Sequence, residues 1–127
     1  MRIVLLAVAV AGTLLSAGAA QADQRCRQAR LTFFNETGEP IRIFRFRYYD
    51  IEDQVMRTND ILNADIAAGG AVTVYETLEY VGNEAIGDVS VQFRIGPDGG
   101  RMWSDPNPAS VTRCTTHESI SHIVTLP

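Results

Sequence analysis

The stretch Val89-Ser90-Val91-Gln92-Phe93-Arg94-Ile95, followed by Gly96-Pro97-Asp98-Gly99-Gly100, decides the fold class. Its apolar and polar residues alternate with a period of two, which is typical of a strand with one buried face. The glycines and the proline behind it predict a tight turn. Because strand periodicity recurs along the chain and helical periodicity is almost absent, the sequence predicts an all-β protein.

Further strand patterns lie on both sides of this stretch. They cover Leu31–Asn35, Ile41–Tyr49, Val72–Tyr80, Arg101–Trp103, Val111–Cys114 and Ile120–Leu126. We expect about seven short strands in a single small antiparallel β-sandwich or barrel. The first two runs look like a hairpin around the turn Glu36–Pro40, whereas the polar and poorly periodic segment Asp50–Asn63 indicates a short helical turn or a loop.

Two details of the first runs carry local predictions. Ile41 and Ile43 have the opposite parity to Phe44, Phe46 and Tyr48, so we expect a β-bulge near Ile43-Phe44, or burial of both faces there. The triplet beginning at Asn35 matches a glycosylation acceptor, but we interpret Asn35 as a turn residue whose side chain bonds the nearby backbone.

The N-terminus predicts export. Arg2 precedes an apolar run, Ile3–Leu15, and then Ala20-Gln21-Ala22, which together predict a signal peptide over residues 1–22 with cleavage before Asp23. The alternative is a membrane anchor, but the run is shorter than the roughly 20 residues that span a bilayer. We therefore expect a periplasmic or secreted protein whose β-sandwich domain is residues 23–127, without a membrane span after cleavage.

The cysteines support the same compartment. Cys26 and Cys114 are the only two, and export would deliver both to an oxidising environment. A redox pair and a metal site are the alternatives, yet there is neither a C-x-x-C motif nor a Cys/His cluster with zinc spacing. We expect one structural disulfide that closes the domain.

The layout resembles that of small secreted bacterial all-β domains of uncharacterised role. The residues that carry this resemblance are the turn Asn35–Ile41, Gly69-Gly70 before a strand, and the late Cys114. The resemblance implies an exported all-β fold and implies no activity.

Composition and motifs argue against several function classes. The net charge of −4 and the pI of about 5.0 disfavour a nucleic-acid binder. No G-x-S-x-G elbow or phosphate-binding glycine motif occurs, so we assign no catalytic residue and no cofactor. His117, Glu118 and His122 are the candidates for an alternative function, a small exported enzyme or a periplasmic metal-handling protein. A spacing of five on a strand puts the two rings on opposite faces, so we assign no metal site.

Charge and aromatic residues indicate a candidate binding surface. It consists of Arg42, Arg45, Arg47, Tyr48, Tyr49 and Trp103. The arginines could attract an anionic partner, or they could pair with acidic residues of a neighbouring strand, which is the simpler interpretation. We expect a binding module without catalysis, for example an envelope-interaction, inhibitor or immunity-type protein. Its partner would be an envelope or extracellular protein or a glycan.

Overall fold

The computed structural model describes residues 26–78, 81, 86–109 and 114–127, and this part of the chain is all-β. Its seven strands are β1 (Ala29–Asn35), β2 (Ile41–Asp50), β3 (Val55–Ile66), β4 (Ala71–Glu76), β5 (Ile86–Ile95), β6 (Met102–Trp103) and β7 (Ser119–Val124). The all-β prediction is confirmed. The predicted signal peptide and most of the predicted strand Val111–Cys114 lie outside the described residues.

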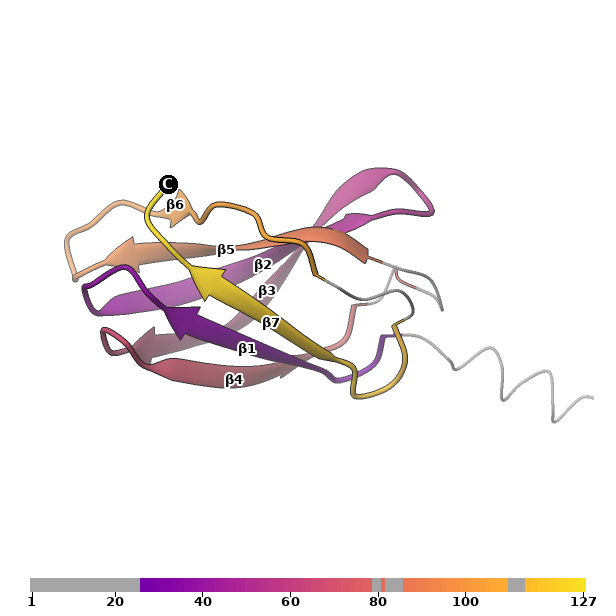
Figure 1. The fold of residues 1–127 in the computed structure, drawn as a ribbon, viewed down its shortest axis with the longest axis horizontal. Helices are drawn as coiled ribbons and strands as arrows, with labels where there is room; N and C mark the ends of the chain where they lie inside the picture. Colours follow the sequence, from indigo (N-terminus) through magenta and orange to yellow (C-terminus); the bar gives the residue numbers. More distant parts are fainter. Residues whose placement is uncertain (1–25, 79–80, 82–85, 110–113) are drawn as a thin grey trace, which may run out of the picture.

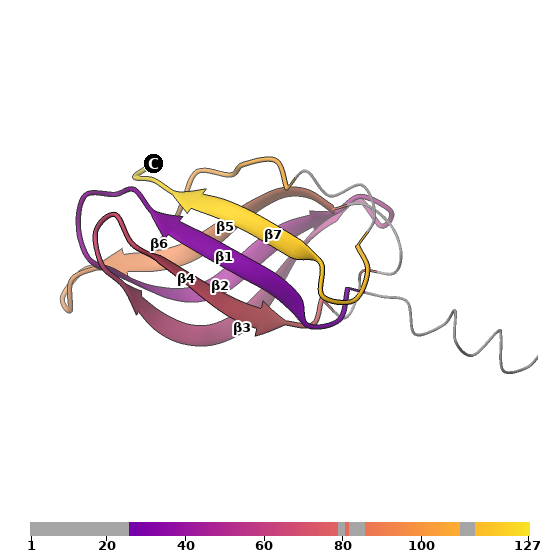
Figure 2. The same ribbon diagram turned by 60° about the horizontal axis from the view of Figure 1, so that its bottom comes forward.

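The strands form two separate sheets that do not close into a barrel. One has the order β4-β1-β7 and the other the order β3-β2-β5-β6 (Figure 1). The smaller sheet lies across the larger one (Figure 2). Between the two sheets the ring of Phe33 in β1 contacts the ring of Phe46 in β2, with 6.0 Å between the ring centres. Each large apolar side chain buried in this shared core contributes about 1.5–3 kcal/mol. The largest of them are Tyr48, Phe33, Phe46, Phe93, Leu31, Ile43, Leu78 and Ile120.

One strand pair departs from the predicted antiparallel arrangement. β7 pairs with β1 in parallel, with Leu31 facing Ile120. A parallel pair needs a long crossover connection, and nearly the whole domain lies between these two strands. The prediction of antiparallel sheets is therefore wrong for this pair, and it is confirmed for the other paired strands of the described chain.

The predicted hairpin between the first two strands does not form. β1 and β2 belong to different sheets, and the turn Glu36–Pro40 carries the chain from one sheet to the other. The turn was recognisable from its residues. The sequence did not show that β1 and β2 belong to different sheets, because this depends on strands that are distant in the sequence.

Asn35, the last residue of β1, holds this crossing in place. Its side chain is fully buried, and its Nδ2 donates hydrogen bonds to the backbone oxygens of Glu39, Ile66 and Ala67 at 2.7, 3.0 and 3.1 Å. Its Oδ1 accepts from the backbone N–H and the hydroxyl of Thr37 at 3.0 and 2.7 Å. The interpretation of Asn35 as a backbone-bonding turn residue is confirmed.

The bulge predicted in β2 lies at Phe44. Ile43 faces Phe93 of β5 and Arg45 faces Gln92, so Phe44 is one extra residue on β2. The register therefore changes parity there, and the apolar residues on both sides of the bulge all point into the core. Phe44 itself lies on the outer face and is 5% exposed.

The segment expected to be a loop or helical turn, Asp50–Asn63, is mostly strand. β3 is the longest strand of the described chain, with 12 residues, and it pairs along β2. It lies at the edge of its sheet and buries only Ile61 and Ile66. An edge strand with two buried side chains leaves no apolar period in the sequence, which explains the error.

The segment that follows β6 bridges the two sheets at one edge. The backbone of Ser104 donates to the oxygen of Val91 in β5 at 2.9 Å, and Ser104 Oγ accepts from the N–H of Val91 at 3.0 Å. Asn107 Oδ1 accepts from the N–H of Ile123 in β7 at 3.2 Å. The contact with Asn107 covers one backbone N–H of β7 that an open edge would expose.

Candidate functional site

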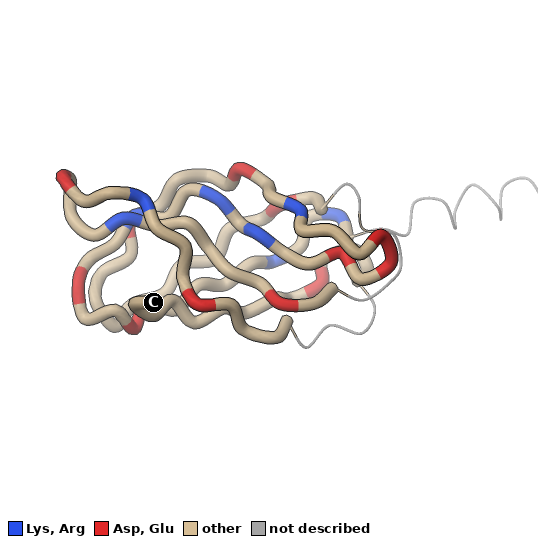
Figure 3. The backbone as a smooth tube through the Cα atoms, turned by 90° about the horizontal axis from the view of Figure 1, so that it is seen from above, with Lys and Arg blue, Asp and Glu red and all other residues tan. Residues whose placement is uncertain are grey.

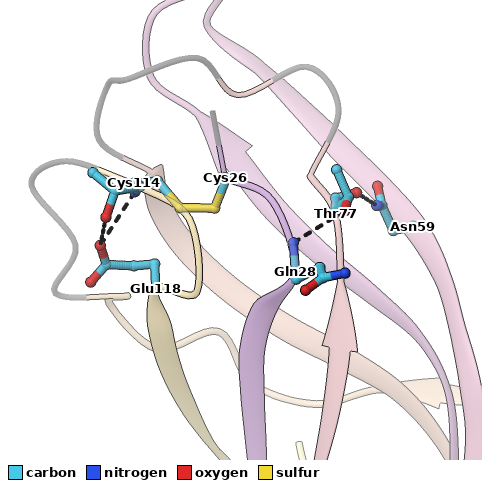
Figure 4. Close-up of a disulfide and its surroundings, with 7 residues drawn as sticks. Cys26, Gln28, Asn59, Thr77, Cys114 and Glu118 are labelled. Atoms are coloured by element: carbon cyan, nitrogen blue, oxygen red, sulfur yellow. Dashed lines mark hydrogen bonds between the residues drawn. A yellow bond between two sulfur atoms is a disulfide. The ribbon is translucent and has the colours of Figure 1, made fainter. Parts of the chain in front are cut away.

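The predicted disulfide is confirmed. Cys26 and Cys114 are bonded across a sequence separation of 88, and both are fully buried. The bond joins the start of β1 to the segment that leads into β7 (Figure 4). It leaves no free thiol for nucleophilic, redox or metal chemistry and indicates an oxidising environment.

The two histidines are not brought together into one site. His117 is exposed in the turn before β7, where its Nε2 lies 3.1 Å from Gln28 Oε1. Glu118 Oε1 accepts hydrogen bonds from Thr115 at 3.4 and 3.3 Å. His122 is 1% exposed in β7. No group of three or more His, Cys, Asp or Glu among the described residues is placed to hold a metal ion.

His122 instead forms a buried pair with a serine. Its Nε2 lies 2.6 Å from Ser104 Oγ, and its Nδ1 has no hydrogen-bond partner among the described residues. Burial lowers the pKa of His122 to about 4. A catalytic serine needs access to substrate and a histidine oriented by an acid. Ser104 is 2% exposed and therefore lacks that access, and the pair links the segment after β6 to β7.

Most of the candidate binding surface lies on the outer face of the larger sheet. We name this region the arginine–aromatic face. It consists of Arg42, Phe44, Arg45, Arg47, Tyr49, Arg94, Arg101 and Trp103. Alternation on the two sides of the bulge in β2, and along β5, turns the strand residues of this set away from the core.

Two of its arginines are neutralised within the sheet. Arg42 forms a two-pronged ion pair with Asp65 at 2.8 and 2.9 Å, and Arg45 Nε lies 2.7 Å from Asp60. The hydrogen bond from Arg42 lowers the pKa of Asp65. These pairs confirm the simpler interpretation for Arg42 and Arg45, each of which meets an aspartate of β3. Both basic and acidic positions are spread over the described part of the molecule (Figure 3).

The other three arginines lie against aromatic rings. The guanidinium carbon of Arg47 is 4.1 Å from the centre of the Trp103 ring, and those of Arg101 and Arg94 are 3.9 and 5.5 Å from that of Phe44. Such contacts contribute about 0.5–2 kcal/mol and fix the guanidinium planes. None of the three has a carboxylate of the described chain within ion-pair distance.

Tyr48 does not belong to this face. Its ring is fully buried and stacks on Phe46 at 5.8 Å. The parity that points Phe46 inward does the same for Tyr48, so its inclusion in the candidate surface is corrected. Sequence reasoning also missed Arg94 and Arg101. For Arg94 a signal was available, because it alternates with the apolar residues of its strand and therefore points to the outer face.

Two hollows flank the arginine–aromatic face. One of about 470 Å³ lies at the end of β2 that carries Arg42 and is lined by Asp65, Arg94 and Pro97 among others. The other, of about 370 Å³, lies near the β2–β3 turn, and Arg47 and Tyr49 line it. The end of this hairpin projects away from both sheets (Figure 1).

Comparisons with known proteins give no family for this chain. No protein-family model, curated protein or solved structure matches it. Within the described residues, no helix is long and apolar enough to cross a membrane.

Proposed function

We propose that this chain is an exported, non-enzymatic binding module that recognises an acidic surface of another protein with its arginine–aromatic face. In this proposal the β-sandwich domain of residues 23–127 acts in the periplasm or outside the cell after cleavage before Asp23. The observation that carries the proposal is the placement of Arg47, Arg94 and Arg101 on aromatic rings without a carboxylate partner in the described chain.

Three arginines on one face that form no ion pair within the described chain suit an acidic partner. A partner carboxylate can pair with each guanidinium without first breaking an internal ion pair. The aromatic contacts also reduce the side-chain entropy that binding would cost, because they already hold the guanidinium groups in place. Arginine, tryptophan and tyrosine are the residues that most often dominate protein–protein binding energy.

The same geometry favours a protein over a glycan. Phe44 is 5% exposed and Arg47 lies over Trp103, so these rings offer little free surface on which a sugar could stack. Acidic side chains need only the guanidinium groups, and Arg101 is exposed while Arg94 is half-buried. A glycan partner is therefore the competing outcome of the test below.

The test compares three immobilised proteins in envelope extracts of the source cells: wild type, Arg94→Ser/Arg101→Ser, and the charge-matched control Arg27→Ser/Arg30→Ser. Arg27 and Arg30 are exposed at the smaller sheet, so the control changes the net charge equally at a different place. We expect wild type and control to retain the same protein, with affinity for it roughly tenfold lower in the face variant, equivalent to about 1.4 kcal/mol.

Retention of the partner should also weaken as salt concentration rises, because the contact is electrostatic. Equal retention by all three proteins would contradict the proposed face. A bound component that survives protease but is removed by a glycosidase would contradict the proposed partner class.

A further inference from the structure

We infer that the hollow beside the β2–β3 turn is a carboxylate-binding subsite in which Arg47 and Ser90 are the donors. The hollow has a volume of about 370 Å³ and is lined by these two residues and by Tyr49, Ile51, Met56 and Asp88, among others. This inference rests on the proposed function, because it names the chemistry at one point of the same face.

The polar floor of the hollow has hydrogen-bonding groups without partners. Arg47 of β2 faces Ser90 of β5 in the register, and both point to the outer face. Ser90 is 1% exposed, and neither its Oγ nor Arg47 Nε has a hydrogen-bond partner among the described residues. Buried polar groups are nearly always partnered, so two neighbouring unpartnered donors in the wall of a hollow indicate a ligand atom that accepts from both.

A carboxylate fits these two donors. It only accepts hydrogen bonds, its oxygens can bond a guanidinium and a hydroxyl at once, and it balances the charge of Arg47. The contact of Arg47 with Trp103 at 4.1 Å keeps the guanidinium at the edge of the hollow. Arg47 and Ser90 both line the hollow, so a carboxylate seated there lies next to both residues.

The other walls restrict which carboxylate enters. Ile51 and Met56 are 45% and 46% exposed and provide an apolar side, next to which Tyr49 lies. Asp88 contributes a negative charge at the exposed rim, which repels a dianion more than a monoanion. The hollow therefore suits a monovalent carboxylate attached to an apolar group and disfavours phosphate or sulfate.

Titration of the full domain with benzoate, followed by NMR, tests this inference directly. Benzamide is the matched neutral compound, because it has the same ring and nearly the same shape. We expect benzoate to shift the Arg47 Nε–H and Ser90 amide signals in a saturable way. The affinity for benzamide should be lower than that for benzoate by a factor of about ten or more. Equal shifts from the two compounds would overturn the inference.

Two variants separate binding from folding. Ser90→Ala should weaken benzoate binding about threefold or more without lowering thermal stability, since it removes an unpartnered buried hydroxyl. Ser121→Ala, at an exposed position of β7, is the control and should change neither quantity. Asp88→Asn should tighten benzoate binding and allow phosphate to compete. Unchanged benzoate affinity in Ser90→Ala would refute the role of Ser90.

Four versions of one short peptide distinguish a side-chain carboxylate from the carboxylate of a chain terminus. The C-terminus is either amidated or a free acid, and one internal residue is either Glu or Gln. Binding that needs neither carboxylate would overturn the inference. The benzoate titration does not involve the natural partner, so the two proposals fail separately. If the Arg94→Ser/Arg101→Ser variant loses the partner but the wild-type domain does not bind benzoate, the proposed face stands and the carboxylate subsite is contradicted. If the wild-type domain binds benzoate but the variant keeps the partner, the proposed face is contradicted and the subsite stands.

Discussion

Replacing the buried Asn35 by Asp tests the account of how the two sheets are connected. The substitution keeps the shape and the acceptor oxygen toward Thr37, but removes the Nδ2 donors from the backbone oxygens of Glu39, Ile66 and Ala67. The two N–H groups of Nδ2 are shared among these three oxygens and Oδ1 accepts two further hydrogen bonds, so at a net contribution of about 1 kcal/mol per N–H donated or bond accepted, Asn35→Ala should cost about 4 kcal/mol. That is a large part of the ~5–15 kcal/mol that stabilises a domain.

The Asp variant should differ from the Ala variant in its pH dependence. Its carboxylate would face three carbonyl oxygens in a buried site, so its pKa in the folded state should lie above the ~3.9 of an unfolded Asp. A raised carboxyl pKa means that stability is lost as pH rises through the folded value. Asn35→Asp should therefore be less stable than Asn35→Ala at neutral pH and more stable in acid, where the protonated carboxyl regains one donor.

Urea unfolding of both variants across this pH range, monitored by the fluorescence of Trp103, measures the difference. Parallel pH profiles for Asp and Ala would refute the reasoning about the three carbonyl oxygens. A loss of less than about 1 kcal/mol in both variants would show that Asn35 does not hold the crossing between the sheets.

Three further results are expected. Replacing both Cys26 and Cys114 by Ser should lower the free energy of unfolding by about 4–5 kcal/mol, measured by urea unfolding, because the bond closes a long loop; no loss would contradict this. Because burial lowers the pKa of His122 to about 4, stability should fall by roughly 3 kcal/mol as pH drops from about 6.5 to 4, and His122→Gln should flatten that profile. Gly99→Ala should lower the melting temperature, costing about 2 kcal/mol, because its Cβ would collide with the backbone at the end of β5; Gly100→Ala has open space and should not.

Local patterns predicted the parts of the fold that depend on neighbouring residues. The bulge at Phe44 followed from parity within one strand, and the turn at Asn35 followed from its side-chain chemistry. The assignment of β1 and β2 to different sheets and the parallel β1–β7 pair depend on contacts between distant segments. β3 was missed because it is an edge strand with only two buried side chains, so its sequence does not alternate between apolar and polar residues.

The candidate site was predictable to a similar extent. Alternation along β2 placed Arg45 and Arg47 on one face, and the structure adds Arg94 from β5 and Arg101 from the position before β6. Which arginine pairs with an aspartate and which lies on a ring depends on strand register. Register is set by the whole sheet, so the sequence could not separate the arginines that form ion pairs from those that lie on aromatic rings.

The parallel pair of β1 and β7 also determines when the domain can finish folding. β1 is made first and β7 last, yet Leu31 needs Ile120 as its neighbour, and the disulfide spans a sequence separation of 88. The β2–β3 hairpin and β5 can assemble from nearby residues while the smaller sheet still lacks a strand. Contacts between such distant residues slow folding, so an emerging chain carries β1 with one edge open until β7 arrives. During that interval the open edge of β1 can pair with another unfinished copy, which makes the timing of the final strand a determinant of yield.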